Sequence, residues 1–238
     1  MYVWALLIVV QITIQAIFPV VIVPIFNRLT PLPEGNLREQ IESLAKRINF
    51  GLSGIFTMDG SKRSTHSNAF FAGIGKFRRI VLFDTLVSTL SEKELLSVLA
   101  HEMGHNVKKH VRTGLVMSGV TSLAGLYVLS ILLPQPWFCS AFKFAHLSSY
   151  AALFVFMKTA GSFAFFLSPL ASMLSRKQEY EADRFAAQVV EDHQPMIQSL
   201  VKLTSDNLST LTPHPLYSFF YYSHPTVMER IKALEGGA

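Results

Sequence analysis

The chain has 238 residues and a formal net charge of +5, and 50% of its residues are hydrophobic while only 16% are charged. This composition is too apolar for an average soluble domain. The sequence has no phosphate loop, no glycine fingerprint and no basic stretch interleaved with aromatic residues, which excludes the common modes of nucleic-acid binding. The single cysteine, Cys139, rules out an intrachain disulfide and a thiolate zinc cage. We therefore expect an integral membrane protein whose positive charge contacts the lipid bilayer on the cytoplasmic side.

Three apolar stretches are long enough to cross a bilayer. They comprise residues 1–26, residues 113–133 and residues 150–170, and the last contains a single charge, Lys158. Buried core helices are the alternative. The length of each stretch and its lack of charge favour three transmembrane helices instead.

Basic residues predict how these helices are oriented. Residues 27–112 carry 13 Lys and Arg, residues 134–149 carry only Lys143, and residues 171–238 carry six. Because cytoplasmic loops are enriched in Lys and Arg, we place the first and last of these segments on the cytoplasmic side and the 134–149 loop on the opposite side. The sequence leaves open whether the membrane is a bacterial inner membrane or the endoplasmic reticulum.

A small β-hairpin is predicted within the cytoplasmic region. Residues 68–72 and 79–83 are strand-like and are separated by a connection that contains glycine. An extended peptide can bind along the edge of such a strand as an added strand, and Asn68 at its start would hydrogen-bond the peptide backbone. A hairpin that serves only packing is the alternative.

A His-Glu-Met-Gly-His motif begins at His101. In a helix, His101 and His105 lie one turn apart on one face, so both imidazoles reach a single Zn²⁺. Glu102 then faces the open side of the metal, where it can take a proton from bound water and return it to a leaving amine. Ser91 and Glu94 form a capping-box pattern that predicts the helix start. Two exposed histidines on a surface helix are the alternative, which the cap and the apolar residues before the motif disfavour.

The third metal ligand must come from outside this motif, because a catalytic zinc site needs three protein ligands and one open position. Where metzincins place Gly and His, this chain has Lys108 and Val111. In a later stretch with helical character, Glu179 and Asp183 share a face one turn apart, while Glu181 points away. Glu179 would complete a site for one Zn²⁺ per chain, and Asp183 would orient a ligand histidine or donate a proton. An amphipathic helix with solvated carboxylates is the alternative.

Four segments together resemble the type I CAAX prenyl endopeptidases, which are integral-membrane zinc proteases, with HtpX-like proteases as more distant relatives. The segments are residues 67–71, the helix of the His-Glu-Met-Gly-His motif, residues 179–183 and residues 224–230. The resemblance implies zinc ligation by His101, His105 and Glu179, catalysis by Glu102 as base and Asp183 as proton donor, and substrate or transition-state contacts by Asn68, His224 and Arg230. On their own, His224 would be interpreted as a capping or surface histidine and Arg230 as a solvated helix charge.

The resemblance also bears on the architecture. Members of the family have seven membrane spans, and this chain matches the last three together with the metal site. The resemblance therefore implies either a C-terminal fragment or a second polypeptide that supplies the N-terminal transmembrane half. The expected fold is mainly α and integral to the membrane, with three transmembrane helices, a cytoplasmic-side helical zinc-protease domain and a small β-hairpin.

The leading functional hypothesis is a membrane zinc metalloendopeptidase that cleaves near the C-terminus of a peptide or protein substrate, as in CAAX prenyl-protein processing. An HtpX-like protease that performs membrane-protein quality control without prenyl specificity is the alternative. A third hypothesis, of another class, is an inactive membrane scaffold or fragment. Zinc content separates the first two hypotheses from the third, and cleavage of prenylated against unprenylated peptides separates the first from the second.

Overall fold

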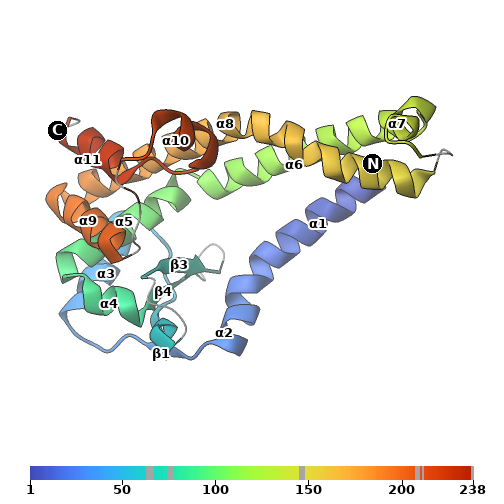
Figure 1. Cartoon of the computed structure of the whole chain (residues 1–238). Coiled ribbons are helices and arrows are strands. Elements are labelled where there is room, and N and C mark those ends of the chain that lie inside the picture. The colour runs from blue at the N-terminus through green and yellow to red at the C-terminus, as the bar shows by residue number, and fades with distance from the viewer. Residues whose placement is uncertain (63–66, 74–77, 145–147, 207–209, 211, 237–238) are drawn as a thin grey trace.

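Three long helices project from a lobe in which shorter helices surround a small sheet (Figure 1). The computed structural model describes residues 1–62, 67–73, 78–144, 148–206, 210 and 212–236. The shorter helices of the lobe are α3 (Asn36–Arg47), α4 (Asp84–Thr89), α5 (Glu92–Val107), α9 (Gln194–Asp206), α10 (Pro215–Tyr221) and α11 (Val227–Glu235), whereas α7 (Pro136–Ser140) lies at the far end of the long helices. The expected mainly helical membrane fold is confirmed.

The three long helices overlap the three predicted spans to within one residue at Met1 and Leu133, and each is long and apolar enough to cross a membrane. They are α1 (Tyr2–Ile17) continued by a π-helical turn (Phe18–Ile22) and α2 (Val23–Phe26), then α6 (His110–Leu132), and α8 (Ser149–Val190). With 42 residues, α8 is about twice as long as a bilayer requires. The predicted third span ends at residue 170. The helix continues past this residue without a break and enters the lobe.

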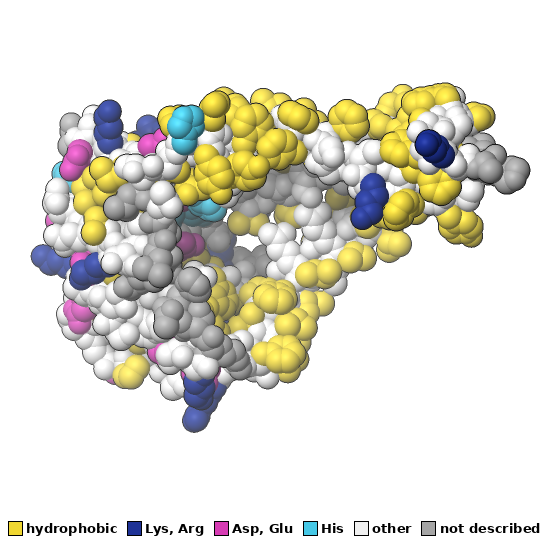
Figure 2. All heavy atoms as spheres, viewed as in Figure 1, with side chains coloured by type: hydrophobic (Ala, Val, Ile, Leu, Met, Phe, Trp, Pro, Cys, Tyr) yellow, Lys and Arg dark blue, Asp and Glu magenta, His cyan; other side chains and the backbone are white. Residues whose placement is uncertain are grey.

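Side-chain hydrogen bonds join α1 to α6 within their apolar stretches. Trp4 Nε1 donates to the backbone oxygen of Gly119 at 2.9 Å, and Gln11 Nε2 donates to Ser118 Oγ at 3.0 Å. Lipid offers no hydrogen-bonding partner, so polar groups at this depth must find one on a neighbouring helix. On the face shown in Figure 2, exposed apolar side chains cover much of the long helices outside the lobe.

Among the described residues, the sheet has four strands, two more than the predicted hairpin, in the order β1–β2–β4–β3. The strands are β1 (Leu29–Pro31), β2 (Gly54–Met58), β3 (Ala69–Ala72) and β4 (Arg79–Phe83). β3 and β4 pair antiparallel, as predicted, while β2 pairs parallel with β4 and antiparallel with β1. The connection between β3 and β4 lies partly outside the described residues. β3 forms one edge of the sheet, which is the position that strand addition requires.

The apolar core of the lobe fixes α5 against the sheet and α3. Its most deeply buried members include Ile41 of α3, Ile80 and Leu82 of β4, and Leu95 and Leu99 of α5. Burial of each such side chain contributes about 1.5–3 kcal/mol. Helix α5 also packs along α8, so the core holds one helix that faces both the sheet and the longest helix.

The start of α5 confirms the predicted capping box. The backbone N–H of Ser91 donates to Glu94 Oε2 at 2.7 Å, and the Ser91 side chain accepts from the third helical residue. The helix ends at Val107, and Lys109 adopts the left-handed conformation with φ of 62°. This residue turns the chain into α6, so the helix of the His-Glu-Met-Gly-His motif and the second long helix are separate elements.

Candidate metal centre

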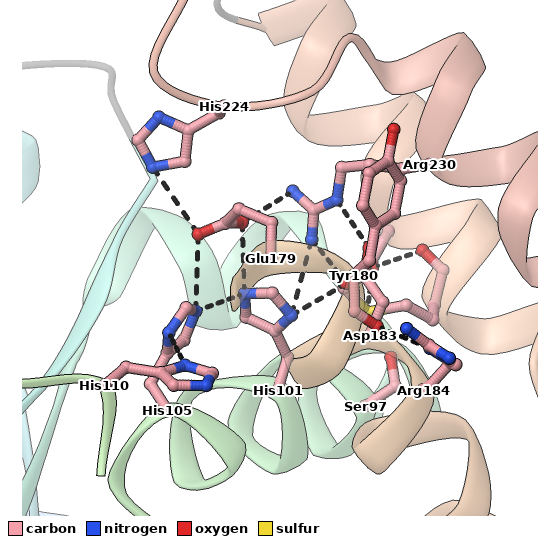
Figure 3. A network of polar contacts seen from close by, with 12 residues as sticks. Ser97, His101, His105, His110, Glu179, Tyr180, Asp183, Arg184, His224 and Arg230 are labelled. Carbon is pink, nitrogen blue, oxygen red and sulfur yellow. Dashed lines mark hydrogen bonds and ion pairs between the residues drawn. The ribbon is translucent and has the colours of Figure 1, made fainter. Parts of the chain in front are cut away.

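Three side chains from two helices converge on one point (Figure 3). His101 and His105 come from α5, and Glu179 comes from α8. The Nε2 atoms of the histidines are 3.1 Å apart, and carboxylate oxygens of Glu179 lie 3.6 Å from His101 Nε2 and 3.4 Å from His105 Nε2. Ligand atoms of a tetrahedral zinc with bonds of about 2.0–2.1 Å are about 3.3–3.4 Å apart. The donor set and its spacing therefore fit a tetrahedral metal ion.

Gly104, between the two histidines, allows α5 and α8 to approach closely enough for this convergence. A Cβ at this position would lie 3.0 Å from Phe185 Cδ1 and 3.3 Å from the backbone Cα of Ala182. The phenyl ring can shift, but the backbone of α8 cannot move at Ala182 without displacing Glu179 one turn earlier. Gly104 was not predicted to have a role, although its place between the ligand histidines is a usable signal.

Asp183 and Arg230 support the first histidine. Asp183 Oδ1 lies 2.8 Å from His101 Nδ1, and Arg230 donates to both oxygens of the same carboxylate at 2.6 and 2.8 Å. A carboxylate at Nδ1 holds the ring so that its Nε2 faces the metal site. Arg230 Nη1 also lies 3.6 Å from Glu179 Oε2, and its side chain is only 13% exposed. Arg230 is therefore not the solvated charge that its sequence context alone indicates.

Glu102 follows His101 on α5 and is half-buried. Burial raises the pKa of its carboxyl and the charge of Glu179 adds to this rise, while His101 and Arg230 act in the opposite direction. A general base works best when its pKa lies near the operating pH. The environment of Glu102 therefore suits a group that exchanges protons during a reaction.

His105 is supported by a residue that the sequence analysis missed. His110, the first residue of α6, lies with its Nδ1 2.9 Å from His105 Nδ1 and with its Nε2 3.1 Å from Glu181 Oε2. Glu181, predicted to point away from the metal, contacts His110 instead. Burial is the main cause that lowers the pKa of His105 to about 3. The ring is therefore neutral near neutral pH, which is the form that binds a metal.

His224 and Asn68 lie at the margin of the site. His224 Nε2 is 3.6 Å from Glu179 Oε1, and the His224 side chain is 64% exposed, so it borders the ligands from the solvent side (Figure 3). Asn68 precedes β3, and its side-chain oxygen accepts from the N–H of Ala69 at 2.8 Å. Within the described ranges, no hydrogen bond or ion pair joins Asn68 to the three ligand residues.

Comparisons with known proteins agree with the resemblance stated from the motifs. The chain is 40% identical over 251 residues to CAAX prenyl protease 1 of Saccharomyces cerevisiae, covering 98% of this chain and 55% of that protein. It is 36% identical over 238 residues to the CAAX prenyl protease 1 homolog of Arabidopsis thaliana, covering 99% and 55%. The chain thus spans little more than half the length of these relatives.

A solved structure and a family model extend the comparison. The crystal structure of S. mikatae Ste24p matches with a TM-score of 0.89 at 37% sequence identity, covering 98% of this chain and 58% of that one. The model of peptidase family M48 matches residues 31–238, which include His101, His105 and Glu179. The chain therefore belongs to peptidase family M48, a family of metalloproteases.

Proposed function

We propose that this chain is the metal-binding part of a membrane zinc endopeptidase that cleaves prenylated protein substrates near their C-terminus. The observation that carries the chemistry is the tetrahedral spacing of His101, His105 and Glu179. The relatives named CAAX prenyl protease 1 support the substrate class. The three long apolar helices support delivery of the substrate from the membrane.

Each residue of the centre has a distinct role in the proposed reaction. His101, His105 and Glu179 hold one zinc ion per chain, and when bound, zinc supplies a Lewis acid that polarises the scissile carbonyl and lowers the pKa of water. Glu102 takes a proton from the attacking water and returns it to the amine that leaves. Its raised pKa suits it for both transfers.

We assign an orienting role to Asp183. Its carboxylate is engaged by the guanidinium of Arg230 and the ring of His101, and an adjacent cation favours the ionised form over a proton donor. Arg230 acts through Asp183 and Glu179 and does not contact the substrate. His224, exposed beside Glu179, donates a hydrogen bond to the charge that develops on the substrate carbonyl.

The edge strand β3 binds the substrate by strand addition in this proposal. The N–H of Phe83 donates to the backbone oxygen of Asn68 at 3.0 Å, which makes these two a hydrogen-bonded pair. Such pairs alternate along an antiparallel ladder, so Phe70, opposite Val81, also bonds toward β4. The N–H of Phe71 then faces the free edge, where it is available to an extended peptide, and Asn68 bonds the peptide at its end.

Phe71→Pro is expected to lower kcat/KM for peptide cleavage about two- to twelve-fold relative to Phe71→Ala, because only proline deletes the edge N–H and one hydrogen bond is worth about 0.5–1.5 kcal/mol. Phe71→Ala is the matched control, since Phe71 packs against Phe50 with ring centroids 5.0 Å apart and both variants lose this ring. Zinc content should be the same in both. Equal turnover of the two variants would show that the strand serves packing alone.

Because Lys and Arg are enriched in cytoplasmic segments, the proposed orientation places the metal centre on the cytoplasmic side and α7 on the opposite side. Cys139 is buried and makes a poor reporter, so we use exposed positions in a Cys139→Ser background. A membrane-impermeant thiol reagent added on the non-cytoplasmic side should label Ser140→Cys and leave Ser205→Cys unlabelled. The reverse pattern would invert the orientation.

The proposed function is tested by cleavage of C-terminal CAAX peptides in lipid vesicles with zinc, with products identified by mass spectrometry. The full chain is assayed alone and together with a co-expressed polypeptide that supplies the uncovered part of the yeast relative. We expect one zinc per chain and cleavage that depends on the prenyl group. Equal cleavage of prenylated and unprenylated peptides would contradict the substrate class. A chain that binds no zinc would contradict the chemistry.

A further inference from the structure

We propose that His110 and Glu181 form a positioning pair that fixes which nitrogen of His105 carries the proton, and so directs His105 Nε2 toward the metal. The inference rests on the proposed function, because it concerns a ligand of the proposed zinc ion. It assigns a role to two residues that lie outside the set of ligands and catalytic groups.

The contacts form a continuous chain from α8 through α6 to α5. Glu181 Oε2 lies 3.1 Å from His110 Nε2, and His110 Nδ1 lies 2.9 Å from His105 Nδ1. The side chain of His110 is only 6% exposed, so its ring is held between the other two side chains. His105 Nε2, at the far end of the chain, lies 3.1 Å from His101 Nε2 and 3.4 Å from Glu179 Oε1.

The direction of each hydrogen bond follows from the acceptor at one end. An ionised carboxylate only accepts, so Glu181 requires the Nε2–H of His110 as donor. In a neutral ring the other nitrogen is then an acceptor, so His110 Nδ1 accepts from the Nδ1–H of His105. This leaves the lone pair of His105 on Nε2, the atom that faces the other two ligands.

Each ligand histidine is thus supported at its Nδ1 by a carboxylate, one directly and the other through a second imidazole ring. His101 meets the carboxylate of Asp183 directly through Nδ1, whereas His105 reaches the carboxylate of Glu181 through the ring of His110. The left-handed residue Lys109 between α5 and α6 places His110 where it spans this gap. Carboxylate support of a ligand histidine is general in metal sites, and its loss costs about 10–100-fold in metal affinity or activity.

The test compares the zinc affinity of the purified full chain, by chelator competition, with that of variants at the two positions. His110→Leu keeps a similar volume and removes both hydrogen bonds, so we expect a loss of about 10–100-fold. His110→Asn places an amide oxygen near the position of Nδ1 and restores an acceptor for His105, so we expect it to recover most of this loss. Glu181→Gln keeps the shape of the side chain, but its amide can either accept a hydrogen bond from His110 or donate one to it. The orientation of His110 is then only partly fixed, so we expect a smaller loss of zinc affinity than for His110→Leu.

Two controls separate positioning from folding. Glu191→Gln alters an exposed carboxylate at the end of α8 that pairs with Arg47 and should keep the wild-type affinity. The visible absorption of bound Co²⁺ should keep its tetrahedral pattern in His110→Asn and change in His110→Leu, and circular dichroism should show the same helix content in all variants.

The outcomes distinguish this inference from the proposed function. A wild-type chain without zinc would overturn the proposed function. If the wild-type chain binds zinc while His110→Leu binds it equally well, or if the Leu and Asn variants lose affinity equally, the positioning pair is overturned and the proposed function stands.

Discussion

Replacing Glu102 with Gln is expected to abolish peptide cleavage while bound zinc stays in place. The amide has nearly the same shape as the carboxylate but cannot take a proton from the attacking water. A positioned general base contributes about 10²–10⁴-fold to a reaction rate, so the loss in kcat should fall in this range. Metal analysis and a cleavage assay on the same preparation measure both quantities.

A control on the same helix sharpens this test. Glu92 is an exposed carboxylate in the first turn of α5 and accepts hydrogen bonds from Asn36 and Gln40, so Glu92→Gln should cleave at the wild-type rate. Turnover of Glu102→Gln at that rate, with zinc confirmed, would remove Glu102 from the mechanism. Loss of zinc together with activity would instead show that Glu102 holds the site together.

The motif helix could be predicted from the sequence because its signals are local. The reciprocal hydrogen bonds of Ser91 and Glu94 depend on residues within a single turn. The four-residue spacing of His101 and His105 fixes their common face once the helix is accepted. The same reasoning put Glu179 and Asp183 on one face of a later helix, and their approach to His101 required only that the two helices pack together.

The resemblance placed Arg230 at the site, but the contacts of Arg230 and the role of His110 depend on tertiary packing. Arg230 resembles any helix-surface arginine until α11 is packed against α8, which buries it between Asp183 and Glu179. His110 follows Lys109, whose backbone is in the left-handed conformation. Non-glycine residues adopt this conformation rarely, and no local sequence pattern predicts it here. Its contact with His105 therefore had no periodic signal in the sequence.

The sheet and the third long helix illustrate the limits of propensity. β1 has three residues and ends in proline, so it does not resemble a strand by composition. β2 begins with Gly54 and is short, and it was not predicted although Ile55, Phe56 and Thr57 favour a strand. Pairing with β4 stabilises β2 as a strand. In α8, the change from apolar to charged residues near position 170 indicated a boundary between two segments. The backbone continues as one helix, because a change of surroundings from lipid to water does not by itself end a helix.

Loss of a group that hydrogen-bonds a metal ligand lowers metal affinity about 10–100-fold. Glu179→Ala should lower zinc affinity further than this, because a charged ligand is itself removed. Neither of the neighbouring carboxylates on α8 replaces it, since Glu181 is engaged by His110 and Asp183 by His101 and Arg230.

Glu191→Ala is the matched control, because it removes an exposed carboxylate from the end of the same helix. Zinc content is measured after dialysis against graded concentrations of chelator, with helix content followed by circular dichroism. We expect the control to retain one zinc per chain while Glu179→Ala loses it at low chelator concentrations. Full occupancy of Glu179→Ala would show that the metal is held by other residues, and the spacing of His101, His105 and Glu179 would then reflect helix packing alone.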